Sequence, residues 1–438
     1  MPEIRPFRAL RFAPERVADL AAVVAPPYDV LSSGDRARLA ARDPRNVVRL
    51  DAPEVEAGDA EGDRYRRAAR TLAAWRSDGT VHKDPRPSLY LLEQTYLVPG
   101  SDVERTQRGF FARLRLEPLQ PGSGVRPHER TLAAPREDRY RLLRATGVNT
   151  SPVVGLFRDP SGTGSDVLER LMSRPSTADV RDDEGVRHRL WVVEAEGENH
   201  DGVADLLAVA AADAVTIADG HHRYETALRY RDERRMSRSC EEDPAFDYIL
   251  MLFLPVDDDA LTVLPTHRLV KGLGEAGVKS LLDRATELFD VEDAAPDRLR
   301  SEFGGTSPGG RGRFGLWTRG GGAVLTARRS EFEPLLPAGG EALRELDVVL
   351  LGAALEQLSG IDPGAVAAGD RVAFTKSAEE AVDAVDAARD GVDAAFLLEP
   401  TPVAAIVEVA ADGDVMPQKS TYFYPKALTG LVINPHEW

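Results

Sequence analysis

Apolar residues follow two different periods along the first 271 residues of the chain. Continuous or alternating apolar runs predict strands, whereas apolar residues spaced three or four apart predict helices. The expected strands are 46–50, 89–97, 107–115, 156–157, 190–193 and 246–255. The expected helices are 33–42, 63–77, 135–146 and 199–212. This mixture predicts an α/β (α+β) fold with a mixed sheet, the strands 89–97 and 107–115 forming a hairpin.

A glycine-containing stretch near residue 272 starts a second α/β domain, predicted to span 272–410. Its expected helices are 278–289, 343–358 and one that begins after the capping-box sequence at 377–380. Its expected strands are 314–317, 323–326, 395–398 and 405–409. Residues 411–438 differ in composition, with lysines, hydroxyls and aromatics, and we expect them to pack back toward the first region.

The most informative pattern lies at 215–231. The β-rich run 215–218 meets Asp219-Gly220, and the sequence from Tyr224 onward is helical. A strand, a tight turn and a helix form an anion-binding geometry, because the first turn of the helix presents backbone N–H groups and its positive dipole end. Gly220 allows a ligand to approach the backbone closely.

Composition narrows the function classes. The formal net charge of −17 argues against general nucleic-acid binding, which requires clustered Lys and Arg. The longest apolar run is shorter than the ~20 residues of a membrane helix, and the N-terminus lacks the apolar stretch of a signal peptide. The single cysteine, Cys240, excludes an internal disulfide and favours a cytoplasmic location. The sequence leaves a homo-oligomer open.

Each polar residue of the turn has an ordinary structural interpretation. Asp219 can cap the helix, His221 and Glu225 can pair on its surface, and Arg223 can bind the end of the sheet. Because His222 adds a further imidazole to the same junction, we favour a functional site.

The pattern fits phosphoryl transfer. Gly220 and the following N–H groups hold a phosphate, while Arg223 and one or both of His221 and His222 neutralise its oxygens. Asp219 either holds Mg²⁺ or orients a histidine.

Five motifs, spread from residue 26 to residue 426, resemble the domain of unknown function 1015 family. They are Pro26–Val30, His128-Glu129, Ala218–Tyr224, Leu264–Arg268 and Met416–Lys426. The Asp-Gly-His-His-Arg turn is also similar to the ParB/sulfiredoxin-like fold and to the free serine kinases built on it. This second resemblance covers about the middle third and places the core at about 100–271, with additional N-terminal and C-terminal α/β elements.

The kinase resemblance implies roles for individual residues. The turn 219–223 would contact the phosphates of a nucleotide, ATP or ADP, with Mg²⁺, and Glu129 would match the glutamate that acts as general base on a substrate hydroxyl. Free serine or phosphoserine is the implied small-molecule partner. In the alternative, Glu129 only pairs with Arg126 or Arg130.

Residues near the end of the chain have two interpretations each. Lys419 and Lys426 either reach the phosphates and close the site, or are surface charges beside a last strand. Tyr422 and Tyr424 alternate as in a strand and favour core positions. His267-Arg268 is expected at the rim of the same sheet as the turn.

Three functions compete. The first is a phosphotransferase or nucleotide hydrolase acting on a small hydroxyl metabolite. The second is a nucleotide-binding ParB-like regulatory module without turnover. The third, a metal-dependent hydrolase using His128, His221, His222 and Asp219, ranks last because adjacent histidines on a helix diverge.

Overall fold

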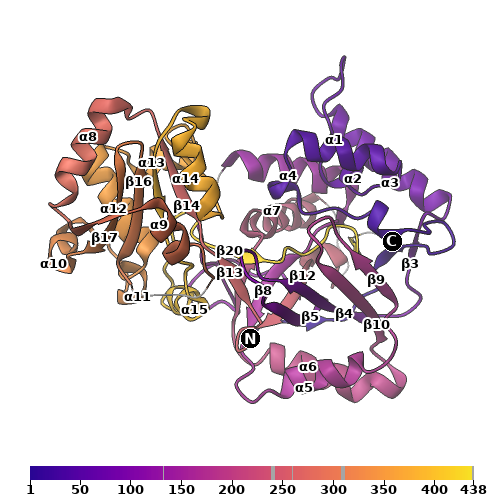
Figure 1. Cartoon of the computed structure of the whole chain (residues 1–438). Coiled ribbons are helices and arrows are strands. Elements are labelled where there is room, and N and C mark those ends of the chain that lie inside the picture. Colours follow the sequence, from indigo (N-terminus) through magenta and orange to yellow (C-terminus); the bar gives the residue numbers. More distant parts are fainter. Residues whose placement is uncertain (132, 238–241, 259, 307–310, 437–438) are drawn as a thin grey trace.

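Two β-sheets form the centres of two units in the computed structural model (Figure 1). The structure describes residues 1–131, 133–237, 242–258, 260–306 and 311–436. Cys240 lies outside the described residues. The class is mixed α/β, as the alternating periods predict.

The larger sheet has nine strands in the order β6-β11-β8-β12-β5-β4-β10-β9, with β1 paired to β5. β11 runs parallel to β6 and antiparallel to β8, so the sheet is mixed. The strands are β1 (Ile4–Arg5), β4 (Ser88–Leu97), β5 (Glu104–Arg115), β6 (Val125–Arg126), β8 (Val153–Phe157), β9 (Ala178–Arg181), β10 (Arg187–Glu194), β11 (Val215–Asp219) and β12 (Tyr248–Pro255). Every residue of β12 is buried, which explains its continuous apolar sequence.

Helices cover this sheet in two groups (Figure 1). α5 (Thr163–Met172) and α6 (His200–Ala210) pack together at one side. At the other, α4 (Ala133–Thr146) packs against both α3 (Asp63–Ser77) and α7 (His221–Ser237). The predicted helices 63–77 and 135–146 and the hairpin of β4 and β5 are confirmed.

The smaller sheet has six strands in the order β15-β17-β16-β19-β14-β18. They are β14 (His267–Lys271), β15 (Phe289–Ala294), β16 (Arg313–Thr318), β17 (Gly321–Ala327), β18 (Val372–Thr375) and β19 (Val392–Leu397). The main helices beside them are α8 (Gly274–Ala285), α9 (Pro296–Phe303), α12 (Asp347–Ser359), α14 (Ala378–Asp386) and α15 (Val403–Ala411). β14 is an inner strand of this sheet, so His267-Arg268 does not lie at the rim of the sheet that carries the turn; that prediction was wrong.

The last part of the chain joins the two units. Residues 415–436, which we call the C-terminal strap, run from α15 across the nine-stranded unit (Figure 1, yellow). Within the strap, β20 (Tyr422–Tyr424) pairs with β13 (Thr262–Leu264), and β21 (Asn434–Pro435) pairs with β7 (Val148–Asn149). Thr429 exchanges two backbone hydrogen bonds with Ala25. The strap is therefore integral to the fold.

Two predicted strands are helical. Residues 46–50 contain α2 (Val48–Asp51), because Asn46 Oδ1 accepts a hydrogen bond from the Val48 N–H and starts a turn. Residues 405–409 belong to α15, which is buried at Ala405, Ile406, Val407, Val409 and Ala410; the pairs 405/409 and 406/410 have helical spacing. In both segments, β-branched residues suggested strands although the packing is helical.

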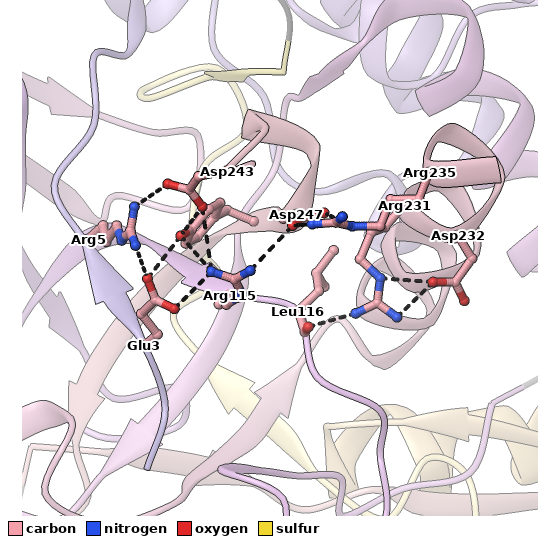
Figure 2. A network of polar contacts seen from close by, with 10 residues as sticks. Glu3, Arg5, Arg115, Leu116, Arg231, Asp232, Arg235, Asp243 and Asp247 are labelled. Atoms are coloured by element: carbon pink, nitrogen blue, oxygen red, sulfur yellow. Dashed lines mark hydrogen bonds and ion pairs between the residues drawn. The ribbon is translucent and has the colours of Figure 1, made fainter. Parts of the chain in front are cut away.

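A charged network ties the start of the chain to the C-terminal half of α7 (Figure 2). This arginine–carboxylate network comprises Glu3, Arg5, Arg115, Arg231, Asp232, Arg235, Asp243 and Asp247. Arg115 is central to it, because its guanidinium lies 3.1 Å from Glu3 and 3.6 Å from Asp247. The far end of α7 is thus held to β5 and to the chain before β12.

Candidate functional site

The predicted strand, turn and helix are present at 215–237. β11 ends at Asp219. Its pairing with β8 shifts register between Ile217 and Asp219, and such an irregularity changes the direction of the strand end. Gly220 follows with a φ of +90°, and α7 begins at His221. A Cβ atom at Gly220 would lie 3.1 Å from the Arg223 guanidinium, so both the backbone and the space favour glycine here.

Asp219 is held between two cations from distant parts of the chain. Its Oδ1 accepts a hydrogen bond from Lys426 Nζ at 2.8 Å, and its Oδ2 accepts one from Arg223 at 2.5 Å. Burial opposes ionisation of Asp219, but the charges of Lys426 and Arg223 outweigh it and lower the pKa. Arg223 also donates to the carbonyl of Pro152 just before β8, as expected for binding at the sheet end.

Two buried histidines line the inner side of the turn. His128 donates from Nδ1 to the carbonyl of Ile217, and its Nε2 accepts from the Thr421 hydroxyl at 3.0 Å. The backbone N–H of His128 donates to His221 Nε2 at 3.2 Å, and the two rings meet edge to face. Burial lowers the pKa of His128 to about 4 and that of His221 well below its usual value. Both imidazoles are therefore neutral at pH 7.

His222 points to a different environment. Burial lowers its pKa, opposed by the carboxylates of Glu225 and Asp29. Among the described contacts, His221 does not pair with Glu225 as one interpretation had it. Glu225 instead accepts hydrogen bonds from Thr131 at 2.8 Å and from Arg136 at 2.6 Å. His222 is half-buried, and Asp29 of the Pro26–Val30 motif acts on it electrostatically.

Glu129 lies where the strap crosses the loop after β6. It forms a parallel bridge with Met416, and its Oε1 accepts a hydrogen bond from the Lys419 backbone N–H at 2.9 Å. Burial raises the pKa of Glu129 to about 7, although Lys419 and Lys426 pull it down. Arg126 pairs with Asp213 instead. Glu129 is therefore a carboxyl that can exchange a proton near neutral pH.

Arg268 is a buried cation that the sequence alone did not identify as part of this site. It donates to the Thr266 hydroxyl at 2.7 Å and to the Lys419 carbonyl at 3.4 Å. Burial lowers its pKa to about 10, and Glu129 partly compensates. The neighbouring His267 is structural, since its Nδ1 accepts the Leu398 N–H. The shared motif Leu264–Arg268 was the only signal that pointed to Arg268.

The cavities lined by Asp219, Arg223 or Lys426 are small, whereas a cavity of about 410 Å³ lies farther along α7, beside Glu225 and Arg136. A cavity of about 40 Å³ is lined by Arg223, and another of about 40 Å³ by Tyr422 and Lys426. A third, beside Asp219 and Lys426, measures about 10 Å³. A single water needs roughly 10–15 Å³. The three small cavities suit waters or single oxyanion groups, so a whole nucleotide would have to extend beyond them.

The residues do not fit a Mg²⁺ ion held by the protein in this arrangement. Both Asp219 oxygens are engaged by cations. Within the described ranges, no three His, Cys, Asp or Glu side chains converge as a metal site. The four proposed ligands of a metal-dependent hydrolase are thus not arranged as a chelating set.

No described helix is both long and apolar enough to cross a bilayer.

Solved structures show distant likenesses, and no curated protein matches the chain. A free serine kinase in complex with AMP is 13% identical, over 77% of this chain and 95% of that one, with a TM-score of 0.36. A conserved hypothetical protein from Pyrococcus furiosus is 13% identical, over 70% and 93%, with a TM-score of 0.34. SbnI with a C-terminal truncation, from Staphylococcus aureus, is 11% identical, over 71% and 85%, with a TM-score of 0.35. Likenesses this distant carry no conclusion about activity.

A family model provides a firmer assignment. It matches residues 4–349, which include the turn 219–223, Glu129 and Arg268. Because the match covers most of the chain, the protein belongs to the family described as Protein of unknown function (DUF1015).

Proposed function

We propose that the protein transfers a phosphoryl group from a nucleotide to the hydroxyl of a small metabolite. One observation carries the proposal: Glu129, a carboxyl that binds the strap at the Lys419 N–H and whose pKa burial raises to about 7, lies near the cations that hold Asp219. Phosphoryl transfer needs both features, a base for the attacking hydroxyl and positive charge for the phosphate oxygens.

The cations bind the phosphates. Lys426 and Arg223 stand at the start of α7, where backbone N–H groups add further donors. His128 and His221 are neutral and supply hydrogen bonds, not charge. The ion pair with Asp219 pre-orients Lys426 and Arg223, so that less side-chain entropy is lost when phosphate binds.

Glu129 acts as the base. As the acceptor oxygen attacks phosphorus, its proton passes to the Glu129 carboxylate, and the bond from phosphorus to the leaving oxygen of the nucleotide breaks. The electron pair of that bond leaves with the shortened nucleotide. A base with a pKa near the working pH contributes roughly 10²–10⁴-fold to such a step.

Free serine, with phosphoserine as its product, is the first acceptor to test, and ATP and ADP are the first donors. The motif resemblance to free serine kinases suggests both. Mg²⁺ enters this proposal only as a counter-ion of the nucleotide.

A regulatory module that binds nucleotide without turnover is the second candidate. The observation that favours it is the engagement of both Asp219 oxygens in ion pairs, beside cavities of about 10–40 Å³. In that case nucleotide binding would displace Lys426 from Asp219 and shift the strap.

The test is ³¹P NMR of the purified protein with ATP or ADP, with and without Mg²⁺, serine and phosphoserine. Phosphoserine formation that requires serine and is lost in Glu129→Gln supports the kinase. Phosphate release without serine identifies a hydrolase. Nucleotide binding by calorimetry with no turnover of any mixture overturns the enzyme and favours the regulatory module.

A further inference from the structure

Lysine is scarce in this chain, and half of the lysines lie at one place. Of the 55 Lys and Arg residues, only six are lysines: Lys83, Lys271, Lys279, Lys376, Lys419 and Lys426. Lys376, Lys419 and Lys426 influence one another electrostatically around Tyr422 and Glu129. A chain that uses arginine almost everywhere else therefore places compact ammonium charges at the candidate site, and these two cations are not interchangeable.

Lys376 reaches the site from the other unit. It lies between β18 and α14 in the six-stranded unit, and its Nζ stands 3.9 Å from the centre of the Tyr422 ring. Lys426 Nζ stands 4.2 Å from the same ring while it binds Asp219. Tyr422 is thus an aromatic contact shared by one ammonium group from each unit, since the face of an aromatic ring attracts cations.

The charge around Lys376 is incompletely compensated. Partial burial lowers its pKa; Glu184 and Glu380 oppose this, and Lys426 and Lys419 add to it. Glu380 accepts a hydrogen bond from the Thr375 hydroxyl. Among the described residues, Lys426 forms an ion pair with Asp219, whereas the ammonium groups of Lys376 and Lys419 form none, although the Lys419 backbone N–H binds Glu129. Lys376 and Lys419 repel each other without an ion-pair partner, and Lys426 has only the Asp219 carboxylate, which it shares with Arg223, so a polyvalent anion beside them is favoured.

We propose that Lys376 is a phosphate-binding residue and that the anionic ligand bridges the two units, from Lys376 on one side to Lys426 on the other. The ligand class is a di- or triphosphate, whose length and charge suit several separated ammonium groups. This inference rests on the proposed function for its ligand, the polyphosphate of a nucleotide. It adds that the six-stranded unit completes the binding site.

The test compares Lys376→Ala with Lys279→Ala, a matched lysine that is exposed on α8 of the same unit. Calorimetry at low salt measures the binding of ATP, inorganic pyrophosphate and adenosine to each full-length protein. Lys376→Ala should weaken ATP and pyrophosphate binding about tenfold, the loss typical of one charge-assisted contact, and leave adenosine binding unchanged. Lys279→Ala should bind all three ligands like the wild type.

A second measurement uses the wild-type protein alone. Brief acetylation followed by mass spectrometry should show that pyrophosphate protects Lys376 and Lys426 but not Lys279. If pyrophosphate binding depends on Lys376 but ATP does not bind, the result would support a bridging polyphosphate and overturn the proposal that the ligand is a nucleotide. ATP binding that is equal in Lys376→Ala and Lys279→Ala, with no protection of Lys376, would overturn the bridge and leave the proposed function standing. Failure to bind either ligand would overturn both.

Discussion

The two ends of α7 carry charged networks that differ in composition and burial. At the C-terminal end, the arginine–carboxylate network combines four arginines with four carboxylates, and side chains such as Arg5 and Asp243 are 41% exposed (Figure 2). At the N-terminal end, Asp219 and Arg223 are only 17% and 11% exposed. The first network is balanced in charge and mostly exposed, with Asp247 as its buried carboxylate, whereas in the second the carboxylate of Asp219 and both of its cationic partners are largely buried.

This difference separates a structural role from a functional one. Every labelled charge of the arginine–carboxylate network has an opposite charge beside it, and such partly exposed pairs need no ligand to explain them. The turn instead keeps Lys419 and Lys376 close to other cations, holds two histidines neutral and places a carboxyl with a pKa of about 7 among them. Perturbed groups gathered in one place are typical of functional sites.

The largest effect is expected from Asp219→Ala. The substitution leaves Lys426 and Arg223 buried without their counter-charge, which typically costs about 3–5 kcal/mol of unfolding free energy. Urea unfolding at pH 7 measures it. The matched control is Asp232→Ala, because Asp232 pairs with Arg231 but is 61% exposed and should contribute at most about 1 kcal/mol. Equal losses in the two variants would show that burial does not distinguish the networks.

Glu129→Gln should lower the rate of phosphoryl transfer by roughly 10²–10⁴-fold. In the wild type, the rate should rise with pH and level off above about 7, where Glu129 is ionised. The residual rate of the variant should lack this rise. Initial rates between pH 5.5 and 9 provide the measurement.

Stability gives an independent check on Glu129. Its folded-state pKa of about 7 exceeds the usual 4.5, so the folded chain binds more protons than the unfolded chain between these values. Ionisation therefore destabilises the fold as pH rises through this window. Glu129→Gln should consequently be more stable than the wild type above pH 7. A variant that lost both activity and stability would indicate a structural role instead.

Because the histidines at the N-terminal end of α7 are neutral, the stability that they contribute should fall on acidification. Burial lowers the pKa of His128 to about 4, so between pH 6.5 and 4 the unfolded chain binds a proton that the folded chain does not. Stability from this group is complete above pH 6.5 and falls by up to about 1.4 kcal/mol per pH unit on acidification. His221 adds to this loss in the same direction.

Replacing His128 with Asn should make the fall in stability shallower between pH 6.5 and 4.5. Urea unfolding at several pH values measures the slope, and His200→Asn, at an exposed position, is the control. In the arginine–carboxylate network the pKa values of Glu3 and Asp243 are lowered despite partial burial, so their contribution is lost only below about pH 4.5. An unchanged slope in His128→Asn would contradict a neutral buried imidazole.

Local pattern was sufficient to predict the turn and most elements. The sequence 215–231 carries its own strand, glycine and helix signals, and β11, Gly220 and α7 appear where those signals place them. The strand predictions for 46–50 and 405–409 were wrong because β-branched residues also occur in helices where packing and local hydrogen bonds favour a helix.

Local pattern did not decide the partners of the turn: it left two interpretations open for Lys426 and did not identify Lys376. Lys426 binds Asp219 across 207 residues of sequence, and Arg268 and Lys376 come from the six-stranded unit. No periodicity encodes such contacts, because they arise only when segments far apart in the sequence pack together. The usable signals were the motifs Leu264–Arg268 and Met416–Lys426 and the scarcity of lysine in the chain.

The smallest effect is expected from Glu3→Gln in the arginine–carboxylate network. Glu3 is 36% exposed and pairs with Arg5 and Arg115, so the loss should be about 0.5–1 kcal/mol. It should shrink further in 1 M NaCl, where the Debye length is about 3 Å. Urea unfolding at low and high salt measures this, beside phosphoryl-transfer rates that should not change. The helix α7 is continuous from His221 to Ser237, so it could couple the two networks at its ends. A Glu3→Gln variant that also lost activity would demonstrate this coupling. The structural network would then contribute to function, and the separation of the two roles would be incomplete.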